Sequence, residues 1–374
     1  MFKKISHSLL VSEPILWLGW IVVILFLVFG NSWLIQLEHG ALFFAVFFGL
    51  FCLILWNSFE VSHHVEVLAE SLQEPFSTLI LTIAVISIEI ALIVNIMLTG
   101  SESPTLARDT MYSIIMIIIN GFVGLSILLG GFRYREQQYN LQGSIAFLSV
   151  IILLAVIGLI LPNFTHSTTG PTFTPFQTLF LIVTSLGIYS IFLIIQTVSH
   201  RKHFIAPFEA QQPFPSFVLH IKYETKLFPY HIVLVIAYLL PSLYLAEQMA
   251  IPINRLLSDL HAPAALGGLV VAILVVTPEG VSAIRASLAN QLQRSVNISL
   301  GSVLASIGLT IPVILSVGLF THKTVVLGLD FSDTTILVLT AIMAILTFVS
   351  GRTNILQGAI HLLLFFVFIL LIFD

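Results

Sequence analysis

Long apolar stretches alternate with short polar connections along the whole chain. An α-helix rises about 1.5 Å per residue, so about 20 apolar residues cross the roughly 30 Å hydrocarbon core of a bilayer. We predict eleven such helices, at about residues 14–35, 41–56, 75–98, 111–131, 144–161, 174–198, 230–245, 265–288, 298–319, 334–349 and 355–373. The pattern therefore predicts an all-α polytopic membrane protein.

Two longer polar segments interrupt this pattern. In residues 58–74, valine and leucine recur at helical spacing, so we predict an amphipathic helix at the membrane surface. Its polar positions hold Glu60, His63, His64, Glu66, Glu70 and Glu74. Histidine titrates in a range that suits pH sensing, although a solvated polar face is the simpler explanation. Residues 199–229 contain basic residues and several prolines, and we interpret them as a cytoplasmic linker.

Two predicted helices carry a similar motif about fifteen residues into the span: Ser87-Ile88-Glu89 and Thr277-Pro278-Glu279. Such a pair in the two halves of a membrane protein indicates an internal repeat. We therefore predict a first transmembrane helix within residues 1–36, a five-helix repeat at 37–198, the linker at 199–229 and a second five-helix repeat at 230–374. Because each repeat holds an odd number of helices, the two repeats should be inverted relative to each other.

The composition excludes several classes of protein. With 58% hydrophobic and 9% charged residues, the chain cannot be a soluble globule. A net charge of −4 gives no reason to expect a nucleic-acid partner, and the single Cys52 excludes a disulfide framework. The motifs of intramembrane enzymes are absent: His-Glu-x-x-His, Gly-x-Ser-x-Gly and paired aspartates. We therefore predict neither an enzyme nor a resident cofactor.

The basic residues predict the orientation. A cytoplasmic N-terminus puts eleven of the fourteen on the cytoplasmic side, namely Lys3, Lys4, Arg133, Arg135, Arg201, Lys202, Lys222, Lys226, Arg285, Arg294 and Arg352. Only Arg108, Arg255 and Lys323 fall outside. The first helix could imitate a signal peptide, but Glu13-Pro14 interrupts it, so we expect it to be retained. Short loops and the lack of a targeting extension fit a bacterial inner membrane.

Glu89 and Glu279 are the anomaly of the sequence, because a charged side chain at mid-membrane costs at least about 2.5–3.5 kcal/mol. Inverted repeats would bring the two carboxylates together near the midplane. Burial and like charge both disfavour ionisation of such a pair, so it should hold a proton when empty and release it to a bound cation. A structural alternative is a salt bridge to Arg285, but six residues of helix separate it from Glu279, roughly 9 Å along the axis. Arg285 is better explained as extending toward the cytoplasmic interface.

Further oxygen ligands would complete a site for a hard cation. Candidate auxiliary ligands on these and the following helices are Thr82, Ser87, Asn120, Thr277, Ser302 and Ser306, each of which could equally make packing contacts between helices. Pro278 removes a backbone donor just before Glu279 and so can free carbonyl groups. Glu74 begins its helix roughly 22 Å from Glu89, so it is a candidate for the cytoplasmic mouth or a solvated residue. His361 is interpreted as a hydrogen-bonded packing residue.

These two segments resemble the alpha repeats of the calcium/cation antiporter superfamily. The similar stretches run from Glu74-Pro75 to Glu89, and from Thr277-Pro278-Glu279-Gly280 through Gly301-Ser302 to Ser306. The resemblance covers both repeats and is strongest to ChaA-type bacterial calcium/proton (sodium/proton) exchangers. It implies that Glu89 and Glu279 are the exchange carboxylates and that the following helices complete the site. Relatives often carry Gly-Asn-Ala-x-Glu, whereas this chain has Val85-Ile86-Ser87-Ile88-Glu89.

The sequence thus predicts a secondary antiporter that exchanges Ca²⁺ for protons by alternating access at a midplane site of Glu89 and Glu279. The alternative is Na⁺ or K⁺ exchange for protons at the same site. A channel would instead let ions dissipate without obligatory proton counterflow. The expected partners are therefore cations, protons and lipid, and the sequence gives no oligomeric state.

Overall fold

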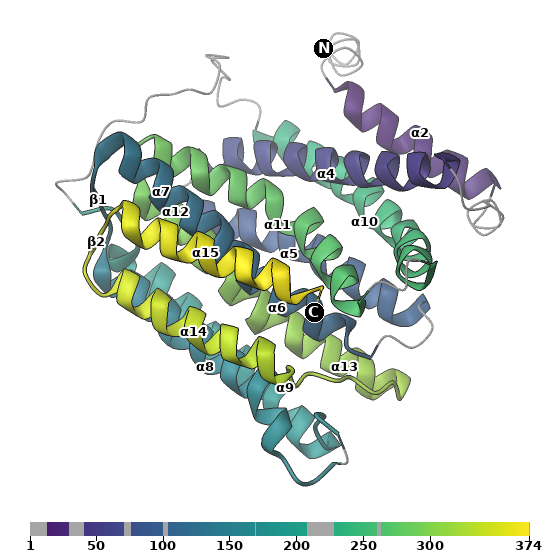
Figure 1. Ribbon diagram of the computed structural model, residues 1–374. Coiled ribbons are helices and arrows are strands. Elements are labelled where there is room, and N and C mark those ends of the chain that lie inside the picture. The colour runs from purple at the N-terminus through teal and green to yellow at the C-terminus, as the bar shows by residue number, and fades with distance from the viewer. Residues whose placement is uncertain are drawn as a thin grey trace.

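The computed structural model describes residues 13–29, 41–70, 76–99, 104–168, 170–207, 228–259 and 263–373. Within them, helices lie side by side in one bundle, and a single pair of short strands joins two loops at one end (Figure 1). The first half contains α2 (Pro14–Phe29), α4 (Ala41–Glu70), α5 (Phe76–Thr99), α6 (Leu106–Ile115), η1 (Met116–Phe122), α7 (Val123–Tyr134), α8 (Leu141–Ala155), η2 (Val156–Ile160), η3 (Leu161–Phe164), α9 (Pro175–Ile194), η4 (Ile195–Ser199) and η5 (Arg201–Phe204). The second half contains α10 (Phe228–Asp259), α11 (Ala264–Leu288), α12 (Leu292–Ala305), η8 (Ser306–Thr310), α13 (Ile311–Thr321), α14 (Phe331–Phe348) and α15 (Ile355–Leu371).

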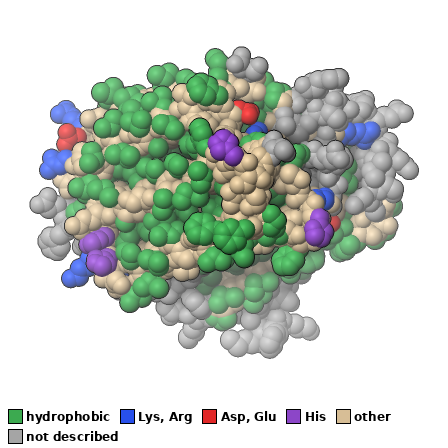
Figure 2. All heavy atoms as spheres, turned by 90° about the horizontal axis from the view of Figure 1, so that it is seen from below, with side chains coloured by type: hydrophobic (Ala, Val, Ile, Leu, Met, Phe, Trp, Pro, Cys, Tyr) green, Lys and Arg blue, Asp and Glu red, His purple; other side chains and the backbone are tan. Residues whose placement is uncertain are grey.

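Eight helical stretches of the described chain are long and apolar enough to cross a membrane, and three shorter apolar helices accompany them. Each of the eleven predicted segments corresponds to one of these helices. Hydrophobic side chains cover most of the described part of one face of the molecule (Figure 2). Such a surface is stable only in lipid or against another protein, so the chain is a polytopic all-α membrane protein.

The predicted surface helix at residues 58–74 is wrong for the part that the structure describes. The second span does not end at Trp56, because α4 continues as one helix to Glu70. Val61 and Val65 are fully buried, and Leu68 is nearly so. α10 is nearly as long as α4 and lies beside it (Figure 1). It ends at Asp259, fourteen residues later than predicted. The hydrophobic positions taken for a membrane-surface face therefore pack inside the bundle.

Two long spans form the centre of the bundle, and each changes from α-helix to π-helix and back. The first runs through α6, η1 and α7, and the second runs through α12, η8 and α13. Both are mostly buried inside the protein. π-Helical turns inside α-helices are frequent at functional sites, because they rotate the following side chains. α5 and α11, which carry the two intramembrane glutamates, pack against both of these spans.

Close helix packing places α11 against the first of these spans. A side chain at Gly280 would meet the ring of Phe122, since a Cβ atom built there lies 2.3 Å from the nearest ring carbon. At Gly268 the nearest atom is the backbone carbon of Asp109, at 2.6 Å. Small residues let membrane helices approach in this way. Glycine at these two positions therefore fixes α11, and with it Glu279, beside the α6–η1–α7 span.

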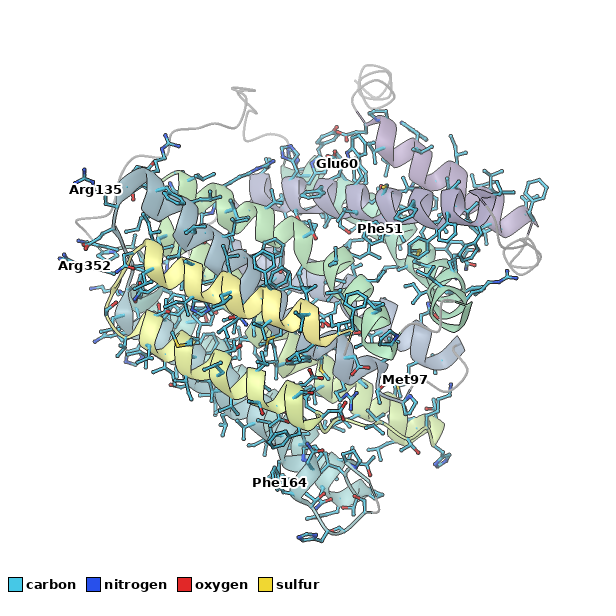
Figure 3. The ribbon with its side chains drawn as sticks, viewed as in Figure 1. Phe51, Glu60, Met97, Arg135, Phe164 and Arg352 are labelled. Carbon is cyan, nitrogen blue, oxygen red and sulfur yellow. The ribbon has the colours of Figure 1, made fainter. Side chains whose placement is uncertain are left out.

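One end of the bundle is closed by an antiparallel pair of strands, β1 (Gln137–Gln138) and β2 (Arg352–Thr353). Arg135 and Arg352 lie together at this end, whereas Met97 lies toward the opposite end (Figure 3). The hydroxyl of Tyr139 donates to the carbonyl of Thr347 at 3.1 Å, and burial raises the pKa of that phenol. The strand pair joins the loop after α7 to the loop before α15, and Tyr139 connects the first of these loops to the end of α14.

The predicted linker at 199–229 begins as ordered structure. Phe204 is fully buried, and its carbonyl accepts a hydrogen bond from Asn297 Nδ2 at 2.7 Å. Asn140 Nδ2 donates to the carbonyl of Lys202 at 3.1 Å. Residues 208–227 lie outside the described part of the chain. The beginning of the connection therefore docks on α8 and α12.

Candidate cation and proton site

Two carboxylates are buried at the centre of the bundle. Glu89 on α5 is 1% exposed, and Glu279 on α11 is 2% exposed. Both side chains face the α12–η8–α13 span, Glu89 through Ser306 and Glu279 through Ser302. The structure thus brings the two predicted exchange residues to one buried region, although they are 190 positions apart in the numbering.

Three hydroxyl groups from a single span hold these carboxylates. Ser306 Oγ donates to Glu89 Oε2 at 2.6 Å, and Thr310 Oγ1 donates to Glu89 Oε1 at 2.7 Å. Ser302 Oγ donates to Glu279 Oε2. Two of these residues, Ser302 and Ser306, are candidates that the sequence predicts. One side of the α12–η8–α13 span therefore faces both glutamates.

Thr310 is the site residue that the sequence analysis missed. Ser302, Ser306 and Thr310 follow one another at intervals of four residues, which puts all three on nearly the same helix face. In an α-helix, side chains four residues apart differ in direction by about 40°, so the third residue of this series would point away from the site. Thr310 ends the π-helical segment η8, whose wider turn reduces that rotation. The four-residue series of hydroxyl side chains is the signal that could have identified it.

The two carboxylates are not equally satisfied. Both oxygens of Glu89 accept a hydrogen bond, whereas Oε1 of Glu279 is buried and accepts none from the described residues. A buried carboxylate oxygen without a donor costs several kcal/mol unless a proton or a cation neutralises it. Glu279 is therefore the carboxylate that has most to gain from binding either one.

Pro278 does not break the helix that carries Glu279. α11 runs continuously from Ala264 to Leu288 with the proline inside it. Proline lacks an N–H group, so the carbonyl of Leu274, four residues earlier, loses its helical partner. The prediction that Pro278 frees a carbonyl group toward a cation stays a prediction, whereas the helix itself is not interrupted.

The remaining candidate ligands on α5 and α11 do not contact the glutamates. Ser87 is exposed and donates to the carbonyl of Ile83 at 2.8 Å, so it faces out of the bundle. Thr277 donates to the carbonyl of Ile273 at 2.6 Å. Thr82 is buried two turns before Glu89, close to Gly301. Helical rotation carries the hydroxyls of Ser87 and Thr277 away from the carboxylates despite their similar depth, whereas Thr82 lies about 10 Å along the helix from Glu89.

Asn120 belongs to a separate buried network. Its Nδ2 donates to Thr340 Oγ1 at 2.8 Å, and its Oδ1 lies 2.9 Å from His361 Nδ1. The other nitrogen of His361 lies 3.0 Å from Thr347 Oγ1. His361 is thus a hydrogen-bonded packing residue, as predicted, and Asn120 connects η1 to α14 and α15.

Arg285 and Glu74 are the two other charged residues that the sequence singles out. Arg285 is exposed, whereas Glu279 on the same helix is buried, so the two side chains occupy different environments. This agrees with the prediction that Arg285 extends toward the interface. Glu74, the candidate for the cytoplasmic mouth, lies outside the described residues.

A bundle of apolar helices with buried carboxylates and hydroxyls at its centre is typical of a membrane transporter of cations. The family model of the sodium/calcium exchanger protein matches residues 42–198 and 229–373, and the chain belongs to that family. Members of the family are transporters, namely exchangers or antiporters.

Individual proteins are similar over most of their length. The sodium-potassium/proton antiporter ChaA of Escherichia coli (strain K12) is 37% identical over 322 residues, which is 86% of each chain. Among solved structures, the H⁺/Ca²⁺ exchanger CAX matches with a TM-score of 0.68 and 16% identity, over 99% of this chain and 89% of that one. Native YfkE matches with a TM-score of 0.65 and 17% identity, over 86% and 91%. The two structures share the fold of this chain.

Proposed function

We propose that this protein is a secondary antiporter that exchanges a cation for protons at the Glu89–Glu279 pair. The observation that supports it is the burial of two carboxylates, from different halves of the chain, against the hydroxyls of one span. A buried carboxylate must be neutralised, and a proton or a cation can do so. Because the two compete for the same oxygens, binding of one expels the other.

Ca²⁺ is the first candidate cation. The site offers only oxygen ligands, from the two carboxylates and from Ser302, Ser306 and Thr310, and such ligands suit a hard cation. Two carboxylates can neutralise a divalent charge in low dielectric. The similar CAX structure is that of an H⁺/Ca²⁺ exchanger. The cation and the proton are substrates here, so the site needs no resident cofactor.

Na⁺ or K⁺ is the second candidate cation. The relative from Escherichia coli is named a sodium-potassium/proton antiporter, and its identity to this chain extends over 86% of both chains. A monovalent ion would leave one negative charge on the pair, which a single retained proton could neutralise. The same two carboxylates therefore accommodate either cation with a different number of protons.

We further propose that the two halves, 37–198 and 230–374, are inverted repeats that move relative to each other during alternating access. The two segments matched by the family model, 42–198 and 229–373, lie close to these bounds and support the division. The distribution of basic residues supports a cytoplasmic N-terminus, and a bacterial inner membrane is the compartment we propose.

Everted membrane vesicles with an acid interior test this function. Lumenal pH is followed with a dye while CaCl₂, NaCl or KCl is added to wild type, Glu89→Gln and Glu279→Gln. We expect one or more of these cations to release lumenal protons in wild type, and we expect both substitutions to abolish the release. The ion that acts distinguishes the two candidates.

The matched control is Glu136→Gln. Glu136 lies in the loop between α7 and α8, and its side chain is 61% exposed, so the loss of its charge should leave exchange unchanged. If no cation releases protons from wild-type vesicles, the chain is not a cation/proton antiporter. If Glu89→Gln and Glu279→Gln both exchange like wild type, the two glutamates are structural.

A further inference from the structure

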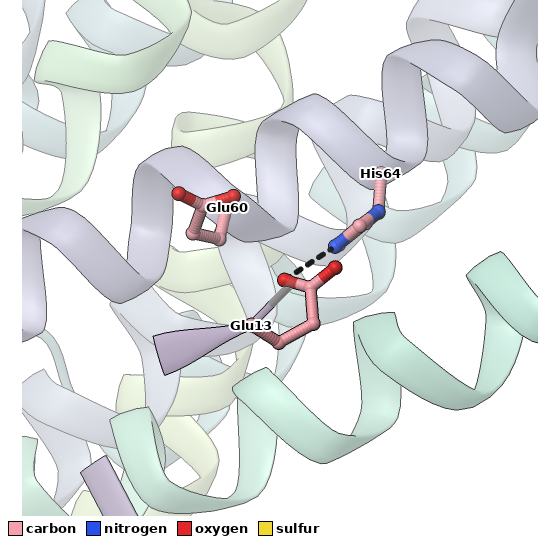
Figure 4. A group of neighbouring side chains, drawn as sticks. All are labelled: Glu13, Glu60 and His64. Atoms are coloured by element: carbon pink, nitrogen blue, oxygen red, sulfur yellow. Dashed lines mark ion pairs between the residues drawn. The ribbon is translucent and has the colours of Figure 1, made fainter. Parts of the chain in front are cut away.

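A second cluster of ligand-type side chains lies at the start of α2 and shares no residue with the exchange pair. Glu13 directly precedes α2, while Glu60 and His64 lie one turn apart on α4 (Figure 4). One carboxylate oxygen from each glutamate and one ring nitrogen of the histidine all lie within 4.8 Å of one another. Residues from two separate segments therefore point to a common centre.

His64 contributes a buried ring nitrogen that lacks a hydrogen-bond partner among the described residues. The residue is 3% exposed, and the nitrogen is Nε2. The nearest carboxylate oxygen, Glu13 Oε2, is 3.8 Å away, which is longer than a hydrogen bond. Ligand atoms around a tetrahedral metal with bonds of about 2.0–2.1 Å lie about 3.3 Å apart. A shift of about half an ångström would therefore let one ion join both atoms.

Each of these two ligands has an outer hydrogen-bond partner on α10. The Nδ1 atom of His64 lies 3.1 Å from Nδ1 of His231, and the hydroxyl of Tyr238 donates to Glu13 Oε2 at 2.8 Å. Metal-binding histidines and carboxylates usually have such outer partners, which fix their orientation. A metal ion would select the tautomer in which His64 donates from Nδ1 to His231 and keeps a lone pair on Nε2.

We propose that Glu13, Glu60 and His64 bind a divalent transition-metal ion of the zinc class, with water completing its coordination. One imidazole with two carboxylates is a donor set that such ions accept. The bound ion would fasten the start of α2 to α4 and, through His231 and Tyr238, to α10. This site is independent of the proposed exchange reaction.

Cobalt(II), whose visible absorption reports its coordination, tests the proposal on the full-length protein in detergent. After removal of metals with EDTA and dialysis, CoCl₂ is titrated into the protein, and ZnCl₂ is then added to displace the cobalt. We expect one ion to bind per chain and zinc to displace it. His64→Ala and Glu60→Gln should each weaken binding by at least about a hundredfold, and Tyr238→Phe by about tenfold through the loss of an outer partner.

Three controls make the outcome specific. His63→Ala removes the adjacent exposed histidine and should leave binding unchanged, as should His200→Ala with His203→Ala, which removes an exposed and a half-buried histidine outside the cluster. Glu89→Gln with Glu279→Gln should also bind cobalt normally, which excludes the exchange pair as the site. Size-exclusion profiles without metal show that each variant is folded. The proposal is overturned if wild type binds no cobalt at micromolar concentration, or if His64→Ala binds it as tightly as His63→Ala does.

Discussion

The Glu89 carboxylate accepts hydrogen bonds from Ser306 and Thr310, and this pair of donors leads to a prediction at the scale of single residues. A hydrogen bond to a charged group contributes about 1.5–3 kcal/mol. The same hydroxyl oxygens would turn toward a bound cation as ligands. We therefore expect Ser306→Ala and Thr310→Val each to raise the half-maximal cation concentration in the vesicle assay by about tenfold or more.

Ser87→Ala is the matched control for this prediction. Ser87 lies two positions from Glu89 on the same helix, but it is exposed and bonds to the carbonyl of Ile83. Its removal should leave the half-maximal cation concentration within about twofold of wild type, since surface polar changes have little effect. The prediction fails if Ser306→Ala and Ser87→Ala have the same effect.

Residue chemistry and depth in the membrane were readable from the sequence, but helix rotation was not. Glu89 and Glu279 could be named because carboxylates at that depth are rare, and Ser302 and Ser306 because they are hydroxyls on the helix that follows Glu279. Ser87 and Thr277 lie at the same depth, yet they face other directions. Rotation depends on which neighbour each helix packs against and on π-helical turns such as η8, which have no clear sequence pattern.

At the scale of helices, the close contact between α11 and η1 can be tested with Gly280→Ala. The added methyl group would lie 2.3 Å from the ring of Phe122, so the ring or one of the two helices must shift. Overpacking of this kind costs about 1–3 kcal/mol. Because Glu279 is the adjacent residue, we expect a lower melting temperature together with slower exchange.

Gly187→Ala on α9 is the control, since nothing lies within 4 Å of the added methyl group there. It should leave the melting temperature unchanged or raise it slightly, as alanine favours helix. Combining Gly280→Ala with Phe122→Ala should recover part of the lost exchange, because the smaller side chain makes room. A melting temperature and an exchange rate equal to wild type in Gly280→Ala would contradict the packing argument.

The length of α4 shows where prediction of elements fails. Asn57, Ser58 and Ser62 read as the end of a membrane span, yet all three are buried within α4. Hydropathy does not distinguish a polar stripe that faces another helix from one that faces water. The main neighbour of α4 is α10, about 170 residues later in the chain, so only the tertiary structure reveals what buries these residues.

For the whole molecule, the number and order of helices followed from the sequence, because the apolar length of each span is a local property. The arrangement of the spans is not local. The β1–β2 pair, for example, joins loops more than 200 residues apart through Gln137 and Thr353. This pairing puts Arg135 and Arg352 at the same end of the bundle, which agrees with their common assignment to the cytoplasmic side (Figure 3).

Accessibility to a membrane-impermeant maleimide tests that assignment. Cys52 is exposed, so it is first replaced in a Cys52→Ser background. Arg135→Cys, Arg352→Cys and Lys323→Cys are then made singly, all at exposed positions. Lys323 donates to the carbonyl of Met97, at the end of α5 away from β1 and β2 (Figure 3). We expect positions 135 and 352 to react in everted vesicles and position 323 to react in intact cells.

The reverse labelling pattern would invert the proposed orientation while preserving the bundle. Labelling of positions 135 and 352 from opposite sides would contradict the strand pairing itself, because paired strands cannot lie on two sides of a membrane. The orientation of the chain does not set the direction of exchange, because the two ion gradients set it in an antiporter. In the proposed exchange, a proton gradient directed into the cell would drive the cation out whichever side positions 135 and 352 occupy.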